Sequence, residues 1–107
     1  MEDIFHQRDK LASISNQMRY IDFARRHQLK QLAEDAIVLI KALPNEIRGN
    51  NVAWEKNQAV QDIEYRFKKT WLFDDVRGVS KSKGETETKE VIGHLMSAVD
   101  SVVTSIR

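Results

Sequence analysis

Apolar residues recur with helical spacing along residues 4–43. At 3.6 residues per turn they fall on one side of a helix, and no Gly or Pro lies between them. A stripe of this kind is a surface that packs against other helices. Its members are Ile4, Leu11, Ile14, Met18, Ile21, Leu29, Leu32, Ala36, Ile40 and Leu43.

This segment could form one helix or two. An unbroken helix over 3–43 would be roughly 60 Å long, which is too long for a compact domain of this size. The stripe weakens between Ile21 and Leu29, and a turn could lie at Asn16 or within 25–28. A break usually shifts the phase of a stripe, and here the phase is kept. The pattern therefore slightly favours one long, bent helix, with a helix pair as the alternative.

Pro44 ends the first segment, because proline has no N–H and disfavours helix in the residue before it. Residues 44–51 read as a loop, with Asn51 capping a helix predicted over 52–71. The inward positions of that helix are Ala53, Val60, Ile63, Phe67 and Trp71.

The stretch over 74–86 is rich in Gly, Ser and charged residues, and it predicts a flexible loop. Thr86 or Thr88 would then cap the last helix. That helix carries an apolar seam with alternating spacings of three and four residues, as in coiled coils. We expect the seam to mediate self-association through Ile92, Leu95, Val99, Val102 and Ile106.

Together these segments predict a single domain over 1–107. Its class is all-α, an antiparallel helical bundle of three or four helices with a long N-terminal helix or helix pair. We expect it to form a homo-oligomer such as a homodimer, because both terminal stripes are surfaces that another helix must cover.

Composition excludes several classes of function. The 17 Lys and Arg against 16 Asp and Glu give a net charge of +1, so the whole molecule does not attract nucleic acid or anionic lipid. The absence of cysteine excludes disulfides and thiolate chemistry, and it fits a cytoplasmic location. The longest apolar run, 36–40, is far shorter than the ~20 residues that span a bilayer. We therefore expect no membrane partner.

Motifs for catalysis and for metal binding are missing. Residues 78–84 superficially suggest a phosphate-binding loop, but the Gly-Lys-Ser/Thr ending is absent. Glu90 and His94 lie one helical turn apart and lack further ligands for a metal. We predict no catalytic residue, no metal site and no cofactor, and hence a protein that is not an enzyme. The densest polar group is interpreted as an Asp22–Arg25 ion pair among solvated residues: Arg19, Tyr20, Asp22, Arg25, Arg26 and His27.

A second face of the 52–71 helix combines aromatic, basic and aliphatic residues that the first core surface does not need. Aromatic anchors supply much of the affinity at protein interfaces. We therefore predict a non-enzymatic protein–protein interaction module, such as an inhibitor, immunity-type protein, regulator or assembly subunit. The predicted partner-binding residues are Trp54, Tyr65, Lys68, Lys69 and Leu72.

The alternative is a nucleic-acid-binding accessory protein. Basic residues concentrate in 66–83 and are interleaved with Trp71 and Phe73, so they could contact phosphates or stack on bases. Neighbouring Asp and Glu residues weaken this interpretation, which is why nucleic acid is possible as a partner but not favoured. The residues of this alternative are Arg66, Lys68, Lys69, Arg77, Lys81 and Lys83.

Overall fold

The computed structural model describes residues 4–74 and 77–106, which form four α-helices and one small hairpin. The helices are α1 (Ile4–Arg19), α2 (His27–Ala42), α3 (Ala53–Lys69) and α4 (Lys81–Ile106). A short 3-10 turn, η1 (Phe23–Arg25), separates α1 from α2. Strands β1 (Glu46–Ile47) and β2 (Asn50–Asn51) pair in antiparallel register between α2 and α3. The predicted helical class is confirmed, with a two-stranded sheet in addition.

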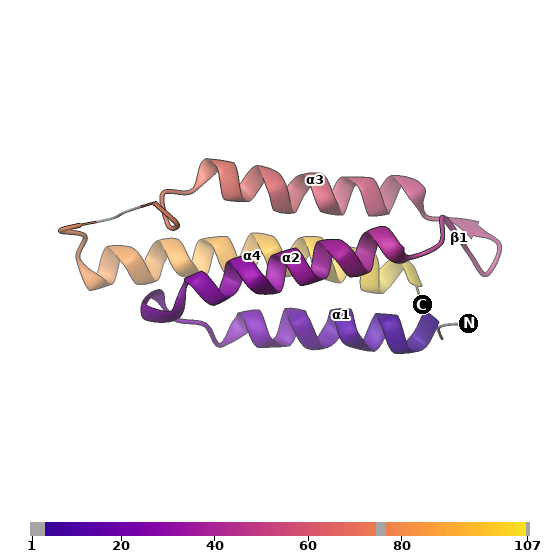
Figure 1. The fold of residues 1–107 in the computed structure, drawn as a ribbon, viewed down its shortest axis with the longest axis horizontal. Coiled ribbons are helices and arrows are strands. Elements are labelled where there is room, and N and C mark those ends of the chain that lie inside the picture. Colours follow the sequence, from indigo (N-terminus) through magenta and orange to yellow (C-terminus); the bar gives the residue numbers. More distant parts are fainter. Residues whose placement is uncertain (1–3, 75–76, 107) are drawn as a thin grey trace.

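The four helices lie lengthwise beside one another in a body of 51 × 21 × 18 Å (Figure 1). The α1–α2 and α3–α4 connections lie at one end of the long axis, which we call the loop end. The β hairpin lies at the opposite end, together with the start of α1 and the end of α4, and we call this the hairpin end. None of the described helices has the length and apolar character needed to cross a membrane.

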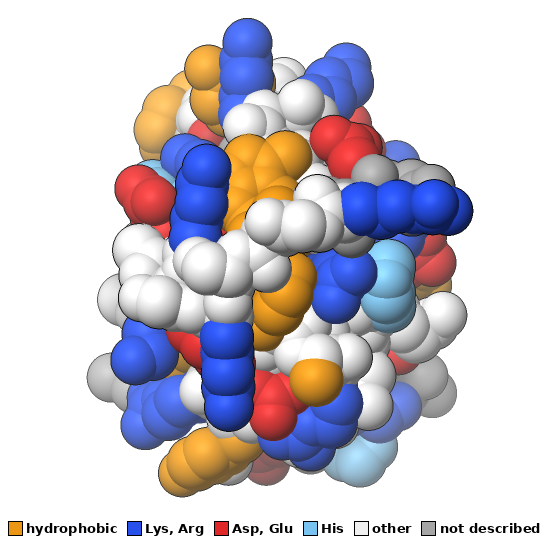
Figure 2. All heavy atoms as spheres, turned by 90° about the vertical axis from the view of Figure 1, so that its left-hand side faces the viewer, with side chains coloured by type: hydrophobic (Ala, Val, Ile, Leu, Met, Phe, Trp, Pro, Cys, Tyr) orange, Lys and Arg blue, Asp and Glu red, His pale blue; other side chains and the backbone are white. Residues whose placement is uncertain are grey.

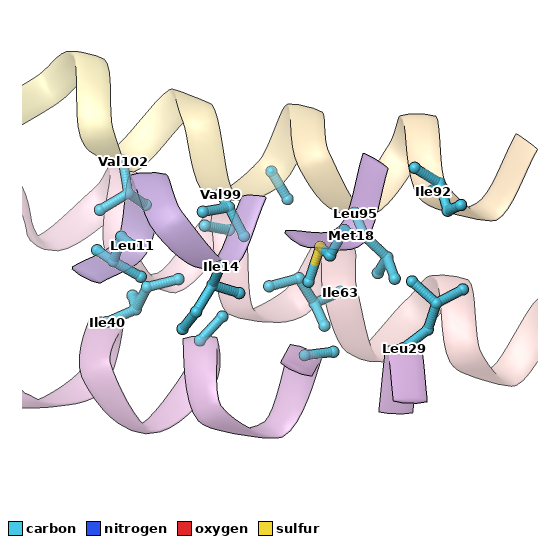
Figure 3. Close-up of a cluster of buried hydrophobic side chains, with 14 of the residues drawn as sticks. Leu11, Ile14, Met18, Leu29, Ile40, Ile63, Ile92, Leu95, Val99 and Val102 are labelled. Carbon is cyan, nitrogen blue, oxygen red and sulfur yellow. The ribbon is translucent and has the colours of Figure 1, made fainter. Parts of the chain in front are cut away.

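The core runs along the length of the molecule, between the four helices. α4 packs mainly against α1 and α3, and α2 packs against the same two helices. Side chains from all four helices point toward one another in the interior (Figure 3). The predicted N-terminal stripe forms much of this core, since Leu11, Met18, Leu29 and Ile40 are all fully buried.

The slight preference for one long N-terminal helix is wrong, because the chain turns between Arg19 and His27. Asp22 adopts an extended backbone, and its carboxylate accepts a hydrogen bond from the Arg25 backbone N–H at 3.0 Å. This bond satisfies a backbone donor at the turn, so the break costs little. The stripe keeps its phase across the turn because both helices face the same core.

The predicted loop over 44–51 contains the hairpin. Arg48 and Gly49 both have positive φ (53° and 82°), which is the backbone that tight two-residue hairpins require. The predicted N-cap, Asn51, is one residue too early: the N-cap of α3 is Val52, whose carbonyl oxygen accepts a hydrogen bond from the Lys56 N–H at 3.0 Å. The Asn51 side chain lies just before it and accepts a hydrogen bond from the Ala53 backbone N–H at 2.9 Å. The helix itself spans Ala53–Lys69, which places Trp71 in the connection rather than on the helix.

The face of α3 that meets the core differs in part from the predicted one. Ile63 is fully buried and Val60 and Phe67 are half-buried, but the positions that complete the buried face are Ala59 and Lys56. The Lys56 ammonium donates hydrogen bonds to the Leu43 carbonyl oxygen and, at 3.0 Å, to the Asn45 side-chain oxygen. A buried lysine thus closes the C-terminal end of α2, where backbone carbonyls lack partners within the helix.

The predicted loop over 74–86 is shorter than expected, because α4 begins at Lys81; residues 75–76 lie outside the described part of the chain. The cap is Ser80 rather than Thr86 or Thr88. Its carbonyl accepts the first helical hydrogen bond, and its hydroxyl accepts a bond from the Lys83 N–H at 3.2 Å. Both threonines lie inside the helix and donate to the carbonyls four residues earlier.

Gly84 is buried where the Phe23 ring covers it, so tertiary packing extends the helix into a Gly- and Ser-rich sequence.

Candidate functional site

The predicted partner face on α3 is exposed at its aromatic positions. Trp54 is 70% exposed and Tyr65 is 58% exposed, whereas Ala59 and Ile63 on the opposite face are buried. Lys68 and Lys69 are exposed as well, and the Lys69 ammonium lies 5.5 Å from the centre of the Tyr65 ring. Four of the five predicted residues therefore share an accessible helix face, which we call the α3 face.

Leu72, the fifth predicted residue, does not belong to this face. The helix ends at Lys69, and the chain then turns Leu72 into the core, where it is fully buried. The Thr70 hydroxyl stabilises the turn because it accepts a hydrogen bond from the Leu72 N–H at 3.1 Å. The helical wheel placed Leu72 outward only because it extended the helix one turn too far.

The predicted self-association seam is part of the interior of a single chain. Leu95 and Val99 are fully buried, and the seam contacts side chains of the other helices (Figure 3). A second copy of the chain could not reach these residues without opening the core. This corrects the predicted surface formed by Ile92, Leu95, Val99, Val102 and Ile106.

Two polar segments that are far apart in the sequence meet at the loop end. The Arg26 guanidinium, from the turn between α1 and α2, donates a hydrogen bond to the Leu72 carbonyl at 2.9 Å. The same guanidinium donates to the Phe23 carbonyl at 3.0 Å and lies 4.4 Å from the centre of the Phe23 ring. The cluster over 19–27 and the basic stretch over 66–83 are therefore parts of one surface.

Aromatic rings connect the same two segments. The Phe23 ring meets Trp71 edge-on at 6.5 Å between centroids, and the Phe73 ring lies 5.0 Å from Phe67 and 6.3 Å from His27. The four Phe and Trp rings are only half-buried. In Figure 2, which faces the loop end, hydrophobic side chains are visible between Lys and Arg side chains.

Positive charge is concentrated at this end of the molecule. Two segments meet here: residues 16–30, from the last turn of α1 to the first turn of α2, and residues 66–84, from the last turn of α3 to the first turn of α4. Together they include ten Lys and Arg but only three Asp and Glu. The rest of the chain has seven Lys and Arg and thirteen Asp and Glu. The net charge of +1 therefore conceals a strong separation of charge.

The residues of the predicted nucleic-acid alternative are at the loop end, and most of them are accessible. Lys68, Lys69, Arg77, Lys81 and Lys83 are exposed. Arg66 is half-buried beside α4, and its Nε atom is buried with no hydrogen-bond partner among the described residues.

One ion pair of the predicted kind is present at this surface. The Arg25 Nε and Asp22 Oδ1 atoms are 3.3 Å apart, as the three-residue spacing suggested. The hydrogen bond from the Arg25 backbone N–H, helped by the Arg25 guanidinium, lowers the pKa of Asp22 from its ordinary value of 3.8. Among the described residues, no group of three or more His, Asp and Glu side chains is placed to hold a metal ion.

Sequence reasoning identified both polar segments but did not join them. The missing element was Arg26, whose hydrogen bond to Leu72 spans 46 residues of sequence. Periodicity within one segment does not predict a contact with a residue so far away in the sequence. Comparison of the chain with protein-family models, curated proteins and solved structures gave no match.

Proposed function

We propose that this chain is a non-enzymatic protein–protein interaction module that binds its partner through the α3 face. The observation that supports this proposal most directly is the exposure of Trp54 (70%) and Tyr65 (58%) on a helix whose opposite face is in the core. Aromatic residues of this size usually bury 150–250 Å² each, so leaving two of them in solvent on one helix forgoes a large hydrophobic gain.

The arrangement suits a docking surface. Trp54 and Tyr65 are eleven residues apart, which is about 16 Å along a helix, and both are on the solvent side. Lys68 and Lys69 add positive charge beside Tyr65. Interfaces commonly have aromatic anchors at the centre and charged groups at the rim. An antiparallel four-helix bundle, which we propose as the description of this fold, would present the face without rearrangement.

The partner in this proposal is another protein, and the class of activity is that of an inhibitor, immunity-type protein, regulator or assembly subunit. A second copy of the chain is the simplest such partner, and the homo-oligomer predicted from the sequence would then form through the α3 face. We propose a cytoplasmic location, since the chain has no cysteine that would require an oxidising compartment.

The proposal is tested with the double variant Trp54→Ser/Tyr65→Ser. Neither side chain is part of the core, so we expect the variant to keep the thermal stability of the wild type. Val38→Ser is the matched control, because Val38 is a comparably exposed apolar residue on α2. Sedimentation equilibrium measures self-association, and quantitative affinity purification followed by titration with the purified partner measures binding of another protein.

We expect loss of about 2 kcal/mol or more of binding free energy in the double variant and no loss in the control. The proposal is wrong if the double variant retains every association of the wild type, or if it loses association only because it unfolds.

A further inference from the structure

Basic residues at the loop end lie where the dipoles of two helices disfavour positive charge. α2 and α4 both start at this end, and neither has an acidic residue in its first turn. The N-terminus of a helix carries partial positive charge, which Asp and Glu stabilise and Lys and Arg destabilise. Here Lys81 and Lys83 occupy the first turn of α4, and Arg25 and Arg26 directly precede α2.

Several exposed cations at the loop end have no ion-pair partner among the described residues. The only ion pair at the loop end among the described residues is Arg25–Asp22. Arg19, Lys68, Lys81 and Lys83 are exposed and have no carboxylate within ion-pairing distance in the described chain. A sequence selected for stability alone would not place unpaired cations at helix N-termini, and such local violations are typical of functional surfaces.

Aromatic groups lie within this positive surface. Tyr20 is 68% exposed and directly follows Arg19 at the end of α1. The Phe23, Trp71 and Phe73 rings are half-buried, and hydrophobic side chains are visible between Lys and Arg side chains at this end of the molecule (Figure 2). Basic residues that contact phosphates, together with rings on which bases stack, are the two components of surfaces that bind single-stranded nucleic acid.

We propose that the loop end binds single-stranded nucleic acid through its sugar-phosphate backbone, with bases stacking on Tyr20 and the neighbouring rings. This inference goes beyond the proposed function, because Lys81, Lys83 and Tyr20 are not part of the α3 face. Nucleic acid is favoured over an acidic protein segment because the surface combines unpaired cations with several accessible rings. The 21 × 18 Å cross-section is wide enough for a strand to contact a few phosphates.

The test measures binding of a fluorescein-labelled oligothymidine of about 20 nucleotides by fluorescence anisotropy. Contact with about four phosphates of a single strand predicts a slope of about −3 for log affinity against log salt. Affinity should therefore fall about 50-fold between about 50 mM and about 200 mM salt. Tyr20→Ser should weaken binding without changing the slope, since it removes stacking and no charge.

The variant Lys81→Glu/Lys83→Glu separates a binding role from a structural one. A glutamate at position 83 forms a capping box with Ser80, so we expect the melting temperature to rise by about 2–4 °C. The same variant should lose at least about tenfold in affinity for the oligonucleotide. The control is Lys10→Glu/Lys41→Glu, which makes the same charge change at exposed positions on α1 and α2 and should reduce affinity far less.

Three results would overturn the proposal. The first is no binding at about 50 mM salt, where phosphate contacts are strong. The second is an equal loss in the control variant, which would show that only net charge matters. The third is displacement of the oligonucleotide by poly-glutamate at a lower charge concentration than by unlabelled oligonucleotide, which would assign the surface to an acidic protein. Trp54→Ser/Tyr65→Ser should keep most oligonucleotide affinity, so failure of one proposal does not imply failure of the other.

Discussion

Lysines have different surroundings at the two ends of the molecule. At the hairpin end, Lys56 is buried and its ammonium is bonded to the Leu43 carbonyl and the Asn45 side chain. At the loop end, Lys81 and Lys83 are exposed and have no ion-pair partner among the described residues. The two sets of lysines differ in the helix end that they face: Lys56 donates to acceptors at the C-terminal end of α2, whereas Lys81 and Lys83 lie in the first turn of α4. A cation at a helix C-terminus stabilises the fold, and one at an N-terminus does not.

The strongest disruption of the loop end should come from Gly84→Val. A Cβ atom at this position would lie 2.6–2.7 Å from three carbon atoms of the Phe23 ring, so the ring must move away from α4. We expect the free energy of unfolding to fall by about 2–3 kcal/mol, measured by chemical denaturation. Gly93→Ala on the same helix is the control, because nothing lies within 4 Å of the added atom. It should gain up to about 1 kcal/mol, and equal losses in the two variants would contradict this account of Gly84.

At the hairpin end, Lys56→Met tests the structural lysine. Methionine retains the apolar stem but leaves the Leu43 carbonyl and the Asn45 side chain without their donor. We expect a loss of about 1–2 kcal/mol in the free energy of unfolding, measured as for Gly84. Lys41→Met, at an exposed position on α2, should change stability by less than about 0.5 kcal/mol. If the two methionine variants were equally stable, the hydrogen bonds of Lys56 would not contribute to the stability of the fold.

Asp22→Asn should have a small and pH-dependent effect on stability at the loop end. The pKa of Asp22 is lower in the folded chain than in the unfolded one, so its charge contributes stability above the unfolded pKa. That contribution disappears as pH falls through the folded pKa. Denaturation curves should therefore show wild type above the variant at neutral pH, with a difference that shrinks below about pH 4. Asp100→Asn on α4 is the control. A difference that stays constant with pH would contradict the role of the carboxylate charge.

The parts of the fold that depend on periodicity were predictable from the sequence. The N-terminal stripe identified Leu11, Met18, Leu29 and Ile40 as core residues, and the wheel of the third helix placed Trp54 and Tyr65 outward correctly. The spacing of apolar residues predicts their burial because the apolar face of a helix is removed from water, whichever element covers it.

The errors arose where distant segments decide the local structure. The start of α4 was predicted too far along the chain because Gly84 is typical of a loop. The packing of the Phe23 ring over Gly84, which the local sequence does not show, accounts for the longer helix. The burial of Lys56 depends on carbonyl and amide acceptors in a different segment. Likewise, the joint surface at the loop end is formed by contacts between distant segments, which include the Arg26–Leu72 hydrogen bond and the Phe23–Trp71 ring contact. Spacing along the chain shows that a face is apolar, but it does not show whether the same chain covers it, as the seam on α4 demonstrates.

The separation of charge along the long axis gives the molecule a large electric dipole in spite of its net charge of +1. In the field of a polyanion such a molecule turns before it makes contact, so that encounters occur with the loop end in front. The capture rate would then depend on orientation more than on total charge. It would decline with added salt over the Debye length of about 10 Å at 0.1 M, well within the 51 Å length of the molecule.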